Sequence, residues 1–156
     1  MVFTKRRADL RRHAGEISFP GGRRDPSDAD LSETALREAE EEIGLPRQEV
    51  GLLWELPLTS TFVTNYLIHP FVGLIPAGLA WRLSAHEVEE VLELALPALR
   101  AGRTRTRLTR RGITFETDAF VVGENLIWGA TARILDNLLA RLEQADLRSA
   151  ARPTGA

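Results

Sequence analysis

Three glutamates in one short segment are the residues best suited to chemistry. In REAEEEIGL, which spans residues 37–45, Glu38, Glu41 and Glu42 are spaced three and four residues apart. On a helix these positions are neighbours, so we expect the three carboxylates to converge. Each like-charged pair opposes the helix by roughly 0.2 to 0.5 kcal/mol. A hard divalent cation such as Mg²⁺ or Mn²⁺ would offset this repulsion, because it prefers carboxylate oxygens and keeps water ligands that phosphates can replace.

The alternative is that the same acids form a solvated face, because runs of charge are usually exposed. Their positions on the helix argue against this for two of them. Glu38 and Glu42 border the apolar stripe of the helix, so we expect them where the helix meets a sheet, whereas Glu40 faces away. Arg37 lies four residues before Glu41 and can pair with it, which would hold that carboxylate in place.

A helix over residues 31–43 must position these acids. Its apolar residues recur every fourth position and form one stripe: Leu31, Ala35, Ala39 and Ile43. Asp30 can cap the start of the helix, with Glu33 three residues further on, and Gly44 can close its end. The sequence therefore predicts both the helix and its two boundaries.

A glycine turn precedes this helix. The sequence Phe19-Pro20-Gly21-Gly22 has strong turn residues, and glycines let a backbone come close to a phosphate and expose N–H donors. Taken alone it is an ordinary tight turn, and only its closeness to the acidic helix points to a ligand. Basic residues upstream could meet an anion, although each one alone is typical of a surface charge: Arg6, Arg11, Arg12 and His13.

The remaining pattern predicts short strands and a second helix. We expect strands over residues 2–4, 16–19, 50–58, 67–75 and 91–96, a turn or short helix over 84–90, a helical turn over 97–101, a hairpin of 104–109 with 113–120, and a helix over 130–142. Two helices beside six or more short strands predict an α/β/α sandwich around a mixed β-sheet. Because the first strand begins at the first residues, an N-terminal strand that precedes it could be missing.

Composition narrows the class of protein. The 156 residues suit one domain, which we place over residues 1–148 with a flexible tail over 149–156. Lys and Arg number 20 against 22 Asp and Glu, so we expect no nucleic-acid partner bound by bulk charge. Cysteine is absent, so a metal must be held by oxygen or histidine. No apolar run approaches the roughly 18 residues of a membrane span, and residues 1–15 lack a signal-peptide core, so we expect a soluble, cytoplasmic protein without a membrane partner.

Residues 21–45 resemble the Nudix box, G-x5-E-x7-R-E-U-x-E-E-x-G-U, in which U is aliphatic. The second half of the box matches without a gap, at Arg37, Glu38, Ala39, Glu41, Glu42, Gly44 and Leu45. In the first half, counting from Gly22 places Asp28 where the box has its first Glu, and the interval from Asp28 to Arg37 is one residue longer than usual.

Residues 3–22, FTKRRADLRRHAGEISFPGG, resemble the coenzyme A pyrophosphatase signature LLTxR[SA]x3Rx3Gx3FPGG. The matching positions are Thr4, Arg6, Arg11, Gly15, Phe19, Pro20, Gly21 and Gly22. Arg7 stands where the signature has Ser or Ala. Residues 126–135, LIWGATARIL, are similar to a C-terminal segment of the same subfamily, so the resemblance covers residues 2–142.

This resemblance implies a Nudix fold and a hydrolase that cleaves coenzyme A or its thioesters to 3′,5′-ADP and 4′-phosphopantetheine with Mg²⁺ or Mn²⁺. It implies Glu38 and Glu42 as the principal metal ligands and Glu41 as a third ligand or the general base. The site residues that it implies are Glu41, Glu42 and Arg37 for catalysis, Glu38, Glu41 and Glu42 for the metal, and Arg6, Arg11, Phe19, Gly21 and Gly22 for the substrate. Glu87, Glu89 and Glu90 are further acids, each with an exposed loop position as the alternative.

Two other functions stay open at this point. A Nudix hydrolase of another substrate, such as ADP-ribose or a dinucleotide, would share the acidic helix and differ only in the segment from Arg6 to Gly22. A silent nucleotide-sensing or coenzyme A-sensing module is expected to have lost carboxylates from the helix, yet all three are present. The partner is in each case a small molecule, and Nudix proteins often form homodimers, although the sequence indicates no interface.

Overall fold

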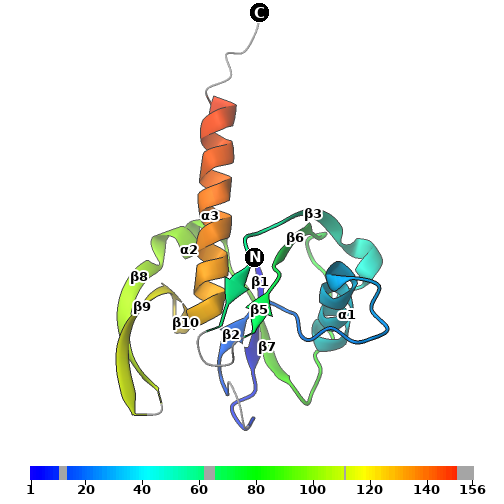
Figure 1. Ribbon diagram of the computed structural model, residues 1–156, viewed down its shortest axis with the longest axis horizontal. Coiled ribbons are helices and arrows are strands. Elements are labelled where there is room, and N and C mark those ends of the chain that lie inside the picture. The colour runs from blue at the N-terminus through cyan, green and yellow to red at the C-terminus, as the bar shows by residue number, and fades with distance from the viewer. Residues whose placement is uncertain (11–13, 62–65, 111, 151–156) are drawn as a thin grey trace, which may run out of the picture.

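The computed structural model describes residues 1–10, 14–61, 66–110 and 112–150 (Figure 1). The elements in chain order are β1 (Val2–Arg6), β2 (Ile17–Ser18), α1 (Leu31–Ile43), the 3-10 turn η1 (Arg47–Glu49), β3 (Gly51–Glu55), β4 (Thr59–Ser60), β5 (Leu67–Ile68), β6 (Phe71–Leu74), β7 (Val88–Glu93), α2 (Leu96–Ala101), β8 (Arg103–Arg110), β9 (Ile113–Val122), β10 (Asn125–Trp128) and α3 (Gly129–Ala150). None of the described helices is both long enough and apolar enough to cross a membrane.

The strands lie between the helices. They form the groups β2-β1-β7, β8-β9-β10, β3-β6 and β4-β5, and the pairs among the described residues are antiparallel. The first two groups adjoin where β10 contacts β2. Figure 1 shows α1 on one side of the β1-β7 strands and α3 on the other. The predicted α/β/α class is confirmed.

Alternation along β1 and β7 explains the two layers. Phe3 and its cross-strand partner Leu92 are buried in the core under α3, whereas Val2 and Val91 contact the core under α1. Successive side chains of a strand point to opposite faces, so one pair of strands supports both helices. The α1 face carries the functional residues.

Helix α1 begins and ends where the sequence predicts. The Asp30 carboxylate accepts hydrogen bonds from the backbone N–H of Ser32 at 2.8 Å and of Glu33 at 2.9 Å. Gly44 has a φ of 69°, in the left-handed region that favours glycine. Ala39 and Ile43 are buried, so the predicted apolar stripe packs on the sheet.

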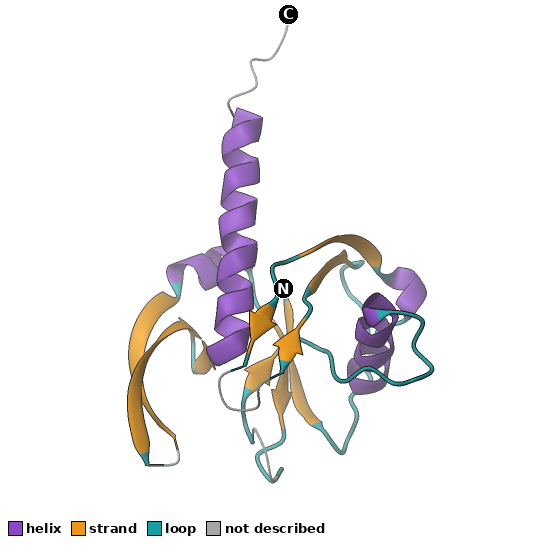
Figure 2. Cartoon of the chain, in the orientation of Figure 1, coloured by secondary structure: helices purple, strands orange, loops and turns teal. Residues whose placement is uncertain are grey.

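Helix α3 was correctly located but is longer than predicted. It spans Gly129–Ala150 rather than residues 130–142, and Figure 2 shows its second half extending beyond the strands. Residues 149 and 150 therefore belong to the helix, and residues 151–156 of the expected tail lie outside the described range. Ala132, Leu135 and Leu139 of this helix are buried in the main core.

Several short strands differ from the prediction. Residues 125–128 form β10, which was not predicted, because its pairing with β9 rather than any pattern of its own defines it. The segment over 84–90 is a turn only as far as Glu87, and β7 begins at Val88, which is buried against α1. Residues 67–75 contain two strands, β5 and β6, because Pro70 lies between them and cannot donate to a ladder.

Candidate active site

The glycine turn lies directly against α1. The backbone N–H of Gly21 donates to the Glu42 carboxylate at 3.2 Å, and a Cβ at Gly22 would overlap the Glu38 carboxylate. The ring of Phe19 stacks on Phe3 with 4.7 Å between the centroids, which anchors the turn in the core. A side chain at position 22 would therefore displace the Glu38 carboxylate from its place against the turn.

Glu42 is the most perturbed acid of this site. It is 6% exposed, and burial raises its pKa to about 7 from the ordinary 4.5. The negative charges of Glu87 and Glu38 raise the pKa further, while the Gly21 N–H and the Arg6 guanidinium oppose the shift. Burial is thus the main cause of the shift, and the neighbouring acids add to it.

This shift predicts how the metal-free protein responds to pH. The folded state holds the Glu42 proton more tightly than the unfolded chain, so stability falls as pH rises from about 4.5 to about 7. Above pH 7 the free energy of unfolding is lower by about 3 kcal/mol. The variant Glu42→Gln is neutral at this position and does not undergo this loss. We expect that variant to have the higher free energy of unfolding at pH 8 and no such advantage at pH 4.5. Urea unfolding in a chelator checks this, and parallel pH profiles for the two proteins would contradict it.

Arg37 organises the other acids of the helix. Its guanidinium donates to the Asp28 carboxylate at 2.9 and 3.1 Å, to Glu38 at 3.0 Å and to Glu41 at 3.0 Å. It also donates to the Arg23 backbone carbonyl at 2.9 Å. The predicted pairing with Glu41 is confirmed, and the structure adds two further carboxylate partners. Arg37 therefore positions acids and does not point into open solvent.

Asp28 fixes the position of the Arg37 guanidinium. It also accepts hydrogen bonds from the Asp25 backbone N–H and the Thr34 hydroxyl, both at 2.8 Å. Its hydrogen bonds with Arg37 are the main reason that its pKa lies well below the ordinary value. Although Asp28 is shorter than the Glu of the Nudix box and one residue further from Arg37, it reaches the guanidinium with both oxygens. Its carboxylate is thus committed to positioning.

The turn before β7 brings another acid to the site. The backbone N–H of Ser84 donates to the Glu42 carbonyl at 2.8 Å, so the turn is bonded to the end of α1. Glu87 in this turn lies 3.8 Å from the Arg6 guanidinium. The Arg6 Nε is buried and has no hydrogen-bond partner within the described residues. Of the three further acids, Glu87 therefore adjoins Glu42, whereas Glu90 pairs with Lys5 at 3.9 Å.

The carboxylates of the site are suitable ligands for a hard divalent cation, although they do not surround a common point. Within the described ranges no three His, Asp or Glu side chains have the arrangement of a preformed metal site. Glu41 is 60% exposed and turned to Arg37, so the predicted convergence of three carboxylates is reduced to Glu38 and Glu42. Glu38 and Glu87 both repel the Glu42 carboxylate, and Mg²⁺ or Mn²⁺ would offset such repulsion by binding the carboxylate oxygens.

The structure thus places most of the predicted site residues. It brings together Glu38, Glu42, Gly21, Gly22 and Arg6, with Arg37 and Glu41 at the edge of this group. The ring of Phe19 is partly buried and stacks on Phe3 at the edge of the core, and its substrate role stays a prediction. Arg11 lies outside the described residues. The sequence analysis did not predict that Asp28 positions Arg37. The position of Asp28 in the Nudix box could have indicated this role.

Comparison with known proteins agrees with this architecture. The family model for the NUDIX domain matches residues 1–108, which include the glycine turn, α1 and the turn before β7. The chain belongs to the Nudix family.

Relatives extend the match over the rest of the chain. The "Uncharacterized Nudix hydrolase NudL" of Photorhabdus laumondii subsp. laumondii is 39% identical over 146 residues, covering 92% of this chain and 77% of its own length. Proteins with the same description in Salmonella paratyphi B and Salmonella newport are each 40% identical over 144 residues, covering 91% of this chain and 74% of theirs. The protein is thus a Nudix pyrophosphohydrolase, and such enzymes generally use divalent metal ions.

Proposed function

We propose that the protein hydrolyses the diphosphate of coenzyme A or its thioesters, giving 3′,5′-ADP and 4′-phosphopantetheine or its acyl form. The observation that carries the proposal is the glycine turn, which ends the segment similar to the coenzyme A signature and lies against Glu38 and Glu42. Arg6, another residue of that segment, ends β1 beside the same acids. Substrate signature and catalytic helix therefore meet at one place.

Each group has a role that suits diphosphate cleavage. Glu38 and Glu42 would hold Mg²⁺ or Mn²⁺, with Glu41 as third ligand or general base and Glu87 as a further acid. A bound divalent ion would screen the charge of the diphosphate and lower the pKa of a bound water. Arg37 holds Glu38 and Glu41 in position.

The substrate phosphates require positive charge and close approach. The Arg6 side chain is 29% exposed and its Nε has no hydrogen-bond partner among the described residues, so its guanidinium can donate to a phosphate oxygen. Gly22 carries no side chain that would keep the diphosphate away from the acids. Arg11 belongs to the same matched segment, and we assign it to the phosphates by that match alone.

The second candidate is a Nudix hydrolase of another nucleoside diphosphate derivative, such as ADP-ribose or a dinucleotide. The helix, the glycine turn and Arg37 serve that reaction equally well. Only the segment from Arg6 to Gly22 favours coenzyme A. A silent sensing module is disfavoured, because Glu38, Glu41 and Glu42 are all present on α1.

A product assay separates these functions. With Mg²⁺ or Mn²⁺ we expect kcat/KM for coenzyme A to exceed the values for dephospho-coenzyme A and ADP-ribose by at least about tenfold, which corresponds to one good ionic contact. Arg11→Ala should narrow this preference, whereas Arg12→Ala, outside the matched signature, should not. Equal rates on the three compounds would remove coenzyme A as the preferred substrate and leave the Nudix assignment standing.

A further inference from the structure

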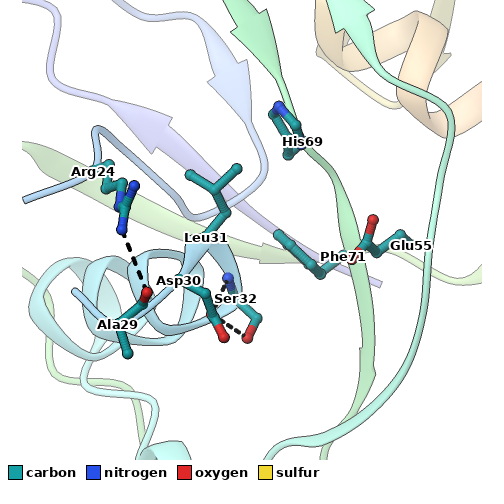
Figure 3. A pocket seen from close by; sticks show the side chains of 8 residues that line it. All are labelled: Arg24, Ala29, Asp30, Leu31, Ser32, Glu55, His69 and Phe71. Atoms are coloured by element: carbon teal, nitrogen blue, oxygen red, sulfur yellow. Dashed lines mark hydrogen bonds between the residues drawn. The ribbon is translucent and has the colours of Figure 1, made fainter.

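A cavity of about 370 Å³ lies beside the glycine turn site, between the start of α1 and strands β3 and β6 (Figure 3). Its walls include Arg24, Asp30, Leu31, Glu55, His69 and Phe71. A volume of this size suits part of a small ligand. None of these residues has a role in the diphosphate chemistry described above.

Helix α1 connects this cavity to the acids. Leu31 at the cavity and Glu38 at the glycine turn are seven residues apart, which is close to two helical turns, so both lie on one side of α1. The separation along the helix axis is about 10 Å. A ribose with its base spans a comparable distance from a diphosphate. One nucleotide can therefore reach from Glu38 into the cavity.

The walls of the cavity offer an aromatic face beside carboxylates. Figure 3 shows the Phe71 ring pointing from β6 toward Leu31 and the first residues of α1. Glu55 is the cross-strand partner of Phe71, so its carboxylate stands next to the ring. Within the described residues Glu55 makes no salt bridge, while one oxygen of Asp30 is used by the helix cap. The carboxylate of Glu55 is thus available to accept a hydrogen bond.

We propose that this cavity binds the nucleoside end of the substrate, with a purine base stacked on Phe71 and its exocyclic amine donating to Glu55. The inference rests on the proposed function, in which the diphosphate lies at Glu38 and Glu42. The pantetheine end fits the walls less well, because it has amides but no aromatic face to stack. Base stacking on an aromatic side chain is a strong and general contact for nucleotides.

Binding of the two product halves to the intact protein tests the proposal. In calorimetry with Mg²⁺, Phe71→Leu should weaken binding of 3′,5′-ADP at least about fivefold and leave 4′-phosphopantetheine unchanged. Leu74→Ala is the matched control, because Leu74 lies on the same strand, is 64% exposed and is not part of the cavity wall. Unchanged 3′,5′-ADP affinity in Phe71→Leu, or a loss confined to 4′-phosphopantetheine, would overturn the proposal.

A second variant covers the case in which Phe71→Leu does not fold. Glu55 is exposed, and Glu55→Ala should lower the preference of the protein for AMP over IMP, which has a carbonyl in place of the amine. A preference that survives, or a parent protein that binds no adenine nucleotide, would refute the cavity assignment. If AMP binds through Phe71 but coenzyme A is not cleaved, the proposed substrate fails and the nucleoside site stands. If coenzyme A is cleaved and Phe71→Leu binds 3′,5′-ADP normally, the nucleoside site fails and the proposed substrate stands.

Discussion

Glu42→Gln is expected to lower kcat by at least about 10²-fold with coenzyme A or any other Nudix substrate that the protein accepts. The substitution keeps the shape of the side chain and its bond with the Gly21 N–H but removes the charge that would hold the metal ion. The affinity for Mn²⁺ should fall in parallel, because a neutral amide oxygen is a weaker ligand than a carboxylate.

Glu40→Gln is the matched control for this prediction. Glu40 is on the same helix, but its carboxylate pairs with Arg47 at 2.8 Å on the face away from the glycine turn. Its kcat and Mn²⁺ affinity should equal those of the parent. A Glu42→Gln enzyme that keeps more than about a tenth of the parent kcat would show that Glu42 is not a metal ligand.

Arg37→Met is expected to have the largest effect on stability. The Arg37 side chain is 17% exposed and the Asp28 side chain 5% exposed, so the substitution leaves an ionised acid enclosed with only the Asp25 N–H and the Thr34 hydroxyl as partners. Removing one partner of an enclosed ion pair is strongly destabilising. We expect the melting temperature to fall by roughly 6 to 12 °C.

Two comparisons make this result specific. Arg47→Met removes an arginine of the same region whose pairs with Glu33 and Glu40 are half-exposed, and should cost at most about 3 °C. The double variant Arg37→Met with Asp28→Asn should recover at least part of the loss, because the enclosed charge of Asp28 is removed together with its partner. Equal melting temperatures for the two single arginine variants would mean that the Arg37–Asp28 pair is not a structural contact of consequence.

The sequence predicted α1 well because the signals for that helix are local. The apolar stripe, the cap at Asp30 and the closing glycine at Gly44 all act within one or two turns of the residues that they determine. The same locality explains the correct positions of Glu38 and Glu42 at the border of the stripe. The face of a helix on which a residue lies depends only on its spacing along the helix. The burial of Ala39 and Ile43 agrees with the face predicted in this way.

The interactions that complete the site depend on contacts between distant segments. The partnership of Arg37 with Asp28 requires the loop over residues 21–30 to fold back along the helix, which no periodicity encodes. The raised pKa of Glu42 similarly depends on burial by distant segments and on Glu87, 45 positions further along the chain, while the Gly21 N–H opposes the shift. Phe19 is another example. A sequence match assigned it to the substrate, and no local pattern indicated that its ring also stacks on Phe3.

The backbone bond from Ser84 to the Glu42 carbonyl has a wider consequence for how the site can be altered. A main-chain hydrogen bond joins the end of α1 to the turn that carries Glu87. The backbone, and not the side chains, therefore sets the spacing of Glu42 and Glu87. Shorter, neutral or metal-selective side chains can therefore be exchanged at either position while the frame between them is preserved. On the proposed role of these acids as metal ligands, the pair is a favourable starting point for redesigning the ion preference of the enzyme.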